Sequence, residues 1–271
     1  MPHFGGAIAN VALLAARAGA RVALAGGVGE DHWGGWLREQ LVEADVDLTR
    51  FETIPGHTTP LALTTVDSDG EPTYTIYGDQ AAGTVVHALR DGVDGAIGEC
   101  AALFISTNTL VGDEERELTM RARDRALELE RPVVFDPNLR LHRWSSRTEA
   151  AASANACVKG ALLVRLTAAE ATVLTREDDP ERAASSLLKA GARNVVITLG
   201  PDGAILRGGV RLDAPGVPTR VVSAIGAGDA LTAALIARLA AAGWYEPAIA
   251  AGLRDGLAEA ALACQRWGAV D

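Results

Sequence analysis

The sequence has few aromatic residues and few cysteines. Aromatic side chains make up only 4% of the 271 positions, and there are three cysteines, Cys100, Cys157 and Cys264. They lie far apart, and no CxxC or Cys/His spacing typical of a zinc or iron–sulfur site occurs. We therefore expect buried structural thiols rather than a metal centre built on cysteine.

Long apolar runs and basic clusters are also absent. No stretch approaches the roughly 18 apolar residues of a membrane span, and the opening segment Met1–Gly6 lacks the charged and apolar parts of a signal peptide. The formal net charge of −10, with no run of lysine or arginine to offset it, would repel a nucleic-acid backbone. We expect a cytoplasmic protein with no membrane and no nucleic-acid partner.

The remaining composition, 48% apolar and 22% charged, suits one globular domain over residues 1–271. Near the N-terminus, apolar periodicity predicts a helix over Asn10–Ala18, a strand over Arg21–Ala25 and a helix over Trp33–Ala44. Leu61–Val66 and Thr73–Tyr77 flank a turn-forming cluster and predict an antiparallel hairpin. We expect this hairpin, approximately residues 58–80, to project from the domain as a lid.

From Ala102 onward, short apolar runs alternate with stretches of helical period. The predicted strands are Leu103–Ser106, Val133–Phe135, Leu162–Val164 and Val195–Leu199, and the predicted helices are Glu114–Glu130, Arg147–Val158, Ala168–Leu174, Glu181–Ala190, Gly226–Ala242 and Glu246–Gln265. This alternation predicts an α/β fold with a mostly parallel sheet covered by helices.

The strongest chemical signal is the run Gly226-Ala227-Gly228-Asp229 at the start of a predicted helix. Small residues at a helix start let backbone N–H groups approach an anion, and the helix dipole favours negative charge there. Asp229 in the same turn could accept a proton from an incoming hydroxyl. The alternative is a glycine-rich helix start with a dipole-satisfying aspartate. Neither a GxxxxGK[ST] phosphate loop nor a GxGxxG dinucleotide fingerprint accompanies the run.

Several other motifs accompany this run in a fixed order. They are Gly5-Gly6 with Asn10, Gly27-Val28-Gly29-Glu30-Asp31 with Gly34, Asp136-Pro137-Asn138-Leu139-Arg140, and Thr198-Leu199-Gly200-Pro201-Asp202-Gly203. Together they resemble the PfkB, or ribokinase-like, carbohydrate kinases over essentially the whole chain. The DPNLR run is most similar to the fructokinase and 2-keto-3-deoxygluconate kinase branches. The resemblance implies a three-layer α/β/α domain with a small β lid.

The resemblance also implies roles for individual residues. It makes Asp229 the catalytic base and Gly226, Ala227 and Gly228 an anion hole for the transferring phosphoryl group. It implies that the sugar is bound by Gly5, Gly6 and Asn10. It implies that the nucleotide is bound by Asn138, Thr198, Gly200 and Gly203, and that Glu170 helps to hold Mg²⁺ through water.

Each of these assignments has a structural alternative. Asn138 and Arg140 could form only a turn and a surface ion pair, Glu170 could be a solvated helical residue, and Thr198 could end a strand before a Pro-Asp turn.

The chain also departs from the family pattern. Only Met1–Phe4 precede Gly5, whereas family members usually begin with a buried strand, an acidic sugar-binding residue and a pair of flap strands. We therefore expect an incomplete lid and an exposed sheet edge. Ser223 and Ala224 replace the usual aspartate and threonine before GAGD, which makes activation by a monovalent cation doubtful.

The predicted function is ATP- and Mg²⁺-dependent phosphorylation of a small sugar or sugar acid, with fructose and 2-keto-3-deoxygluconate as candidate substrates. A homodimer is expected if lid strands pair between subunits. The alternative is an impaired or truncated relative that binds nucleotide or sugar without turnover. An NAD-dependent oxidoreductase ranks last because the glycine spacing does not support it.

Overall fold

The structure is a computed structural model that describes residues 2–66, 72–77, 84–90 and 92–270. The chain forms two compact units. Unit 1 contains Met1–Arg90, Val217–Gly243 and Gly252–Asp271, and unit 2 contains Asp91–Gly216 and Trp244–Ala251. That residues 1–271 form one domain remains a prediction.

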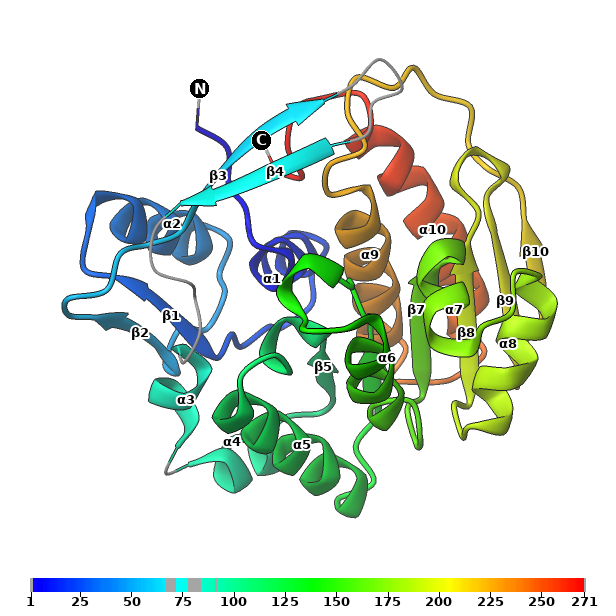
Figure 1. The fold of residues 1–271 in the computed structure, drawn as a ribbon, viewed down its shortest axis with the longest axis horizontal. Coiled ribbons are helices and arrows are strands. Elements are labelled where there is room, and N and C mark those ends of the chain that lie inside the picture. The colour runs from blue at the N-terminus through cyan, green and yellow to red at the C-terminus, as the bar shows by residue number, and fades with distance from the viewer. Residues whose placement is uncertain (1, 67–71, 78–83, 91, 271) are drawn as a thin grey trace. The chain divides into compact units, whose positions relative to one another are not determined.

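Unit 2 is built on a six-stranded sheet with the order β10-β9-β8-β7-β6-β5 (Figure 1). Strands β5 to β8 are parallel, and β9 and β10 each run antiparallel to the preceding strand. The strands are β5 (Leu103–Ile105), β6 (Val133–Phe135), β7 (Leu163–Thr167), β8 (Asn194–Thr198), β9 (Ala204–Gly208) and β10 (Leu212–Ala214). This confirms the predicted mostly parallel sheet.

Helices cover this sheet because its central strands are apolar on both faces. All three residues of β6 are buried, as are the first four of β7 and of β8. Helix α5 packs against β5 and β6, α7 against β7, and α8 against β8 and β9. The helices of unit 2 are α4 (Val93–Glu99), α5 (Asp113–Glu128), α6 (Arg147–Ala156), α7 (Ala168–Thr175) and α8 (Pro180–Lys189), with short 3₁₀ turns η1 (Thr107–Thr109), η2 (Leu141–Arg143) and η3 (Gly200–Asp202).

Unit 1 combines helices with two small sheets. Helix α1 (Ala7–Arg17) packs against α9 (Ala227–Ala241), and α2 (His32–Glu43) and α3 (Thr84–Leu89) pack against β1 (Gly26–Gly29). Strand β1 pairs in parallel with β2 (Phe51–Ile54). The last helix, α10 (Ala248–Ala263), begins in unit 2 and continues in unit 1. A hydrophobic core joins Phe4 and α1 to α2 and to the C-terminal residues Ala269 and Val270.

The predicted hairpin is present. Strand β3 (Leu61–Val66) pairs antiparallel with β4 (Pro72–Tyr77), with Leu61 opposite Tyr77. The predicted turn at 67–70 and the end of the lid at 78–80 lie outside the described residues. Before α1, the described residues 2–6 form no strand.

The predicted strand Arg21–Ala25 is wrong in position. Only Ala23 forms an isolated parallel bridge, to Asp47, and the strand β1 begins at Gly26. Glycine disfavours strands, so the sequence pointed to the more apolar segment before it. The glycines are needed here because a Cβ on Gly27 would lie 2.8 Å from the carbonyl oxygen of Glu52 in β2.

None of the helices in the described ranges is long and apolar enough to cross a membrane. Of the three cysteines, Cys157 is fully buried, whereas Cys100 and Cys264 are half-buried. The expectation of three buried thiols is therefore correct only for Cys157. Burial raises the pKa of its thiol to about 11.

Candidate active site

The start of α9 presents the GAGD run in unit 1. Gly226 is the N-cap residue with a φ of 77°, a left-handed conformation that favours glycine. A Cβ at this position would also overlap the Cα and Cβ atoms of Ala269, so the C-terminal segment packs directly on the Gly226 backbone. Within the described chain no side chain caps α9, and the first turn contains Ala227, Gly228 and Asp229. This helix start has the features of an anion-binding site.

The Asp229 carboxylate is held by a residue from the other end of the sequence. Asn10, in the first turn of α1, is 5% exposed, and its Nδ2 donates to Asp229 Oδ2 at 2.7 Å. The amide must face Asp229 with its nitrogen because two facing oxygens would repel. A hydrogen bond from a neutral donor to a carboxylate is stronger than one between two neutral groups. Asn10 therefore fixes the direction in which Asp229 points.

Gly5 and Gly6 precede α1 and are exposed. Gly6 is the N-cap residue with a φ of 97°, so its backbone requires glycine, and its carbonyl oxygen accepts from the Asn10 N–H at 2.7 Å. Gly5 has no neighbour within 4 Å of the position of a Cβ. Gly6, Asn10 and Asp229 are thus connected in unit 1, and Gly5 lies on the open surface beside them.

A second polar cluster lies in unit 2, where a side chain from β7 meets residues at the carboxyl ends of β6 and β8. Arg165 Nη1 lies 3.1 Å from Asp136 Oδ2, and Arg165 Nη2 donates to Thr198 Oγ1 at 3.2 Å. The side chains of Arg165 and Asp136 are 8% and 5% exposed. A buried ion pair of this kind is tolerated because each charge offsets the other. Arg165, in the middle of β7, thereby links residues at the carboxyl ends of the neighbouring strands β6 and β8. Ligands of open α/β sheets bind at the carboxyl ends of strands.

Asn138 and Glu170 are joined through the segment that follows β6. Asn138 has a φ of 42°, and its N–H donates to Asp136 Oδ1 at 3.2 Å, which forms a tight turn. The next N–H, of Leu139, donates to Glu170 Oε1 at 2.6 Å. Glu170 Oε2 accepts from the N–H and the hydroxyl of Thr167, which completes a capping box at the start of α7.

These contacts bear on whether Glu170 could assist a metal ion. A carboxylate offers about four lone-pair positions, and the three hydrogen bonds leave room for a water. Among the described residues, no group of three or more His, Cys, Asp or Glu side chains could hold a metal by itself. Mg²⁺ usually keeps several waters and binds substrate phosphates with one or two carboxylates. The residues therefore fit a metal that arrives with a nucleotide and meets Glu170 through water.

Gly200 and Gly203 lie in and after the turn η3, directly beyond Thr198 at the end of β8. Their φ angles of 62° and 98° favour glycine, and a Cβ on Gly203 would overlap the backbone of Ala214 and Gly216. The backbone of this turn is therefore tightly packed against the segment that leaves β10.

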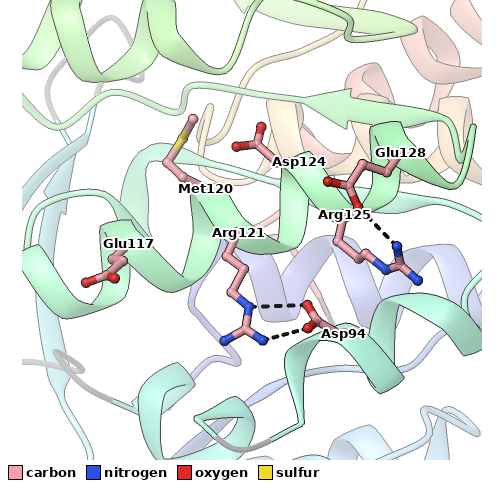
Figure 2. Close-up of a pocket in the computed structure, with 7 residues that line it drawn as sticks. All are labelled: Asp94, Glu117, Met120, Arg121, Asp124, Arg125 and Glu128. Atoms are coloured by element: carbon pink, nitrogen blue, oxygen red, sulfur yellow. Dashed lines mark hydrogen bonds and ion pairs between the residues drawn. The ribbon is translucent and has the colours of Figure 1, made fainter.

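A surface depression of about 550 Å³ lies elsewhere in unit 2, along α4 and α5. Figure 2 shows that charged side chains line it, with Arg121 bridging to both carboxylate oxygens of Asp94 at 3.2 and 2.6 Å. It contains none of the predicted site residues. Its size alone gives no reason to place chemistry there.

The chain is similar to known proteins over almost its whole length. The profile of the pfkB family carbohydrate kinases matches residues 2–271. The chain belongs to this family. As a pfkB family member it is a carbohydrate kinase, and the sequence resemblance is confirmed.

Among its relatives, fructokinase-1 of Oryza sativa subsp. japonica is 30% identical over 241 residues, which cover 87% of this chain and 73% of the rice protein. The fructokinase of Vibrio cholerae O395, solved with fructose, ADP and calcium, superposes with a TM-score of 0.84 at 26% identity and covers 99% and 87% of the two chains. The aminoimidazole riboside kinase of Salmonella enterica, solved with aminoimidazole riboside and an ATP analogue, gives a TM-score of 0.80 at 26% identity and 98% and 86% coverage. The predicted ribokinase-like fold is confirmed.

Sequence reasoning missed three features of these clusters. It did not find that Asn10 holds Asp229, since 219 residues separate them, and no local pattern reveals such a pairing. It assigned no partner to Arg165, which contacts both Asp136 and Thr198. It also did not identify the Thr167–Glu170 capping box, although the spacing Thr-x-x-Glu before an apolar stretch is its sequence signature.

Proposed function

We propose that this pfkB family kinase transfers the γ-phosphate of ATP to a hydroxyl of a small sugar, with fructose as the first candidate. The observation that carries the proposal is the start of α9, where Asp229 follows Gly226–Gly228 and is oriented by Asn10. A carboxylate held in this way can accept the proton of the attacking hydroxyl. Fructose is suggested by relatives that are fructokinases.

In this proposal the residues of unit 1 handle the sugar and the transferring group. Asp229 removes the hydroxyl proton, and the backbone N–H groups of the N-cap residue Gly226 and of Ala227 and Gly228 stabilise the negative charge of the phosphoryl group. Gly5, Gly6 and Asn10 contact sugar hydroxyls. The hairpin β3–β4 closes over the sugar and excludes water, which would otherwise accept the phosphoryl group.

The residues of unit 2 serve the nucleotide. Thr198 ends β8, Gly200 and Gly203 lie in and after the turn η3, and Asn138 lies in the turn after β6. In this proposal these residues line the nucleotide site, with Asn138 beside the phosphates. Glu170 would hold Mg²⁺ through water, and the metal would supply neutralisation of the phosphate charge. The position that bears on a monovalent cation is Ser223, in unit 1. Its side chain is neutral and fully buried, and its hydroxyl accepts from the Ile225 N–H at 3.1 Å. This arrangement gives little reason to expect a monovalent cation there.

The hairpin suggests a homodimer. Leu61, Leu63 and Tyr77 share one face and are 43%, 64% and 55% exposed, and Ile76 on the other face is 51% exposed. An isolated two-stranded hairpin is marginally stable in water. A second copy could cover these side chains. Light scattering should give twice the chain mass for the wild type and the single mass for Leu63→Glu.

The substrate assignment is tested by ADP release over a panel of sugars. The panel contains fructose, other hexoses, ribose, nucleosides and 2-keto-3-deoxygluconate, and a product assay confirms the phosphorylated sugar. Fructose should give the highest kcat/KM. A higher kcat/KM for 2-keto-3-deoxygluconate would show that this acid, not fructose, is the substrate. Binding of ATP or sugar without turnover of any panel member would refute the kinase proposal in favour of a binding role.

A further inference from the structure

The segment that leads into the hairpin is fastened to the start of α2. Thr59, two residues before β3, is 2% exposed, and its N–H donates to Asp31 Oδ2 at 2.6 Å. Its hydroxyl accepts from the Gly29 N–H, at the end of β1, at 3.0 Å. Two hydrogen bonds from different elements therefore fix one residue at the root of the hairpin.

Asp31 uses its two oxygens for two different partners. Oδ1 accepts from the Gly34 N–H at 2.8 Å and caps α2, while Oδ2 holds Thr59. Partial burial opposes ionisation, but hydrogen bonds from the Thr59 and Gly34 N–H groups outweigh it and lower the pKa of Asp31. The group is a carboxylate at neutral pH and serves at once as helix cap and tether.

Two glycines let these backbone segments come together. A Cβ on Gly29 would lie 2.7 Å from the Thr59 nitrogen, and a Cβ on Gly34 would lie 2.9 Å from the Thr59 hydroxyl oxygen. Both positions would also overlap neighbouring carbonyl oxygens, of His57 and Gly29 respectively. The close approach of β1, α2 and the 57–59 segment thus requires small residues as well as the carboxylate.

We propose that Asp31 is a positioning residue for phosphoryl transfer, because it holds the root of the hairpin at Thr59 and so sets where the hairpin closes. The inference rests on the proposed role of β3–β4 as a lid over the sugar. The proposed function gives Asp31 no contact with either substrate. Its effect passes through Thr59 to the strand that begins at Leu61.

The variant that separates the tether from the cap is Asp31→Ser. Serine is a preferred N-cap residue and can still accept from the Gly34 N–H, but its single oxygen cannot also hold Thr59. The matched control is Asp179→Ser, since Asp179 caps α8 through the Arg182 N–H at 2.9 Å and lies in unit 2. Thr59→Ser and Thr59→Val form a second pair, in which only serine keeps the acceptor for Gly29.

We expect amide exchange over residues 57–65 to accelerate about 10- to 100-fold in Asp31→Ser, the size expected for the loss of a hydrogen bond to a carboxylate. The sugar KM should rise by a similar factor with a smaller change in kcat, and ATP hydrolysis without sugar transfer should increase. Thr59→Val should follow Asp31→Ser, Thr59→Ser should resemble the wild type, and Asp179→Ser should leave exchange and KM unchanged.

The exchange measurement tests the contact between Asp31 and Thr59, and the kinetics test the proposed function, so the two can be refuted separately. If the wild type phosphorylates no sugar, the proposed function fails, whereas faster exchange in Asp31→Ser still demonstrates the tether. The positioning role is overturned if exchange over 57–65 does not change, if it changes while the sugar KM of an active enzyme stays the same, or if Asp179→Ser raises KM equally.

Discussion

The contact between Asn10 and Asp229 makes a quantitative prediction about catalysis. Asn10→Ala removes the donor that holds Asp229 Oδ2 at 2.7 Å. A hydrogen bond to a charged group contributes about 1.5–3 kcal/mol, and about 1.4 kcal/mol corresponds to a tenfold change in rate. If this bond orients the base in the transition state, kcat should fall about 10- to 150-fold.

The assay is steady-state ADP release at saturating ATP with the sugar varied. A matched control is Asn155→Ala, because Asn155 Nδ2 donates to the carbonyl oxygen of Leu174 at 2.9 Å in unit 2. Both variants should lose some thermal stability, but only Asn10→Ala should lose kcat. A raised sugar KM with unchanged kcat would instead make Asn10 a sugar contact only, and unchanged kinetics would refute the orienting role.

Three further predictions concern packing and burial. Gly226→Ala should lower the free energy of unfolding, measured by chemical denaturation, by about 2–5 kcal/mol. The alanine would have to adopt a left-handed φ, and its Cβ would overlap the C-terminal segment. The control Gly35→Ala should not lower the free energy of unfolding, because the space around Gly35 is open. The Cys157 thiol, with its pKa raised to about 11 by burial, should stay protonated and unmodified by a thiol reagent at pH 8, reacting only on unfolding; rapid reaction in the native state would contradict its burial. Arg165→Met should lower the free energy of unfolding by about 3–5 kcal/mol because it removes the cationic partner of the buried Asp136 carboxylate, and a melting temperature equal to that of the wild type would contradict the ion pair.

The sequence predicted those elements whose signals are local. Helix α8 carries its own boundary, with Asp179 as the cap and Pro180 in the first turn, and the buried runs of β6 to β8 read directly as strands. The prediction failed where packing overrides propensity, as in the glycine strand β1. It also missed the short helix α4, which contains two glycines, and the three-residue strand β10.

In the candidate site too, the features with a local sequence signal could be predicted, and those that depend on packing between distant segments could not. The helix start at Gly226–Asp229 could be predicted because its motif is contiguous. The partner of Asp229 could not, since Asn10 reaches it only through the packing of α1 on α9. Glu170 is neither simply solvated nor free, because its carboxylate caps α7 and holds the N–H of Leu139.

The most direct test of the account is phosphorylation of fructose by the wild type and by Asp229→Asn, with ADP and sugar phosphate both measured. Asparagine keeps the size of the side chain but cannot accept the hydroxyl proton. The account predicts that the wild type turns over and that Asp229→Asn loses at least about 100-fold in kcat, as expected for a general base, while remaining folded and able to bind nucleotide. Equal turnover by the two proteins would contradict the central claim that Asp229 is the base.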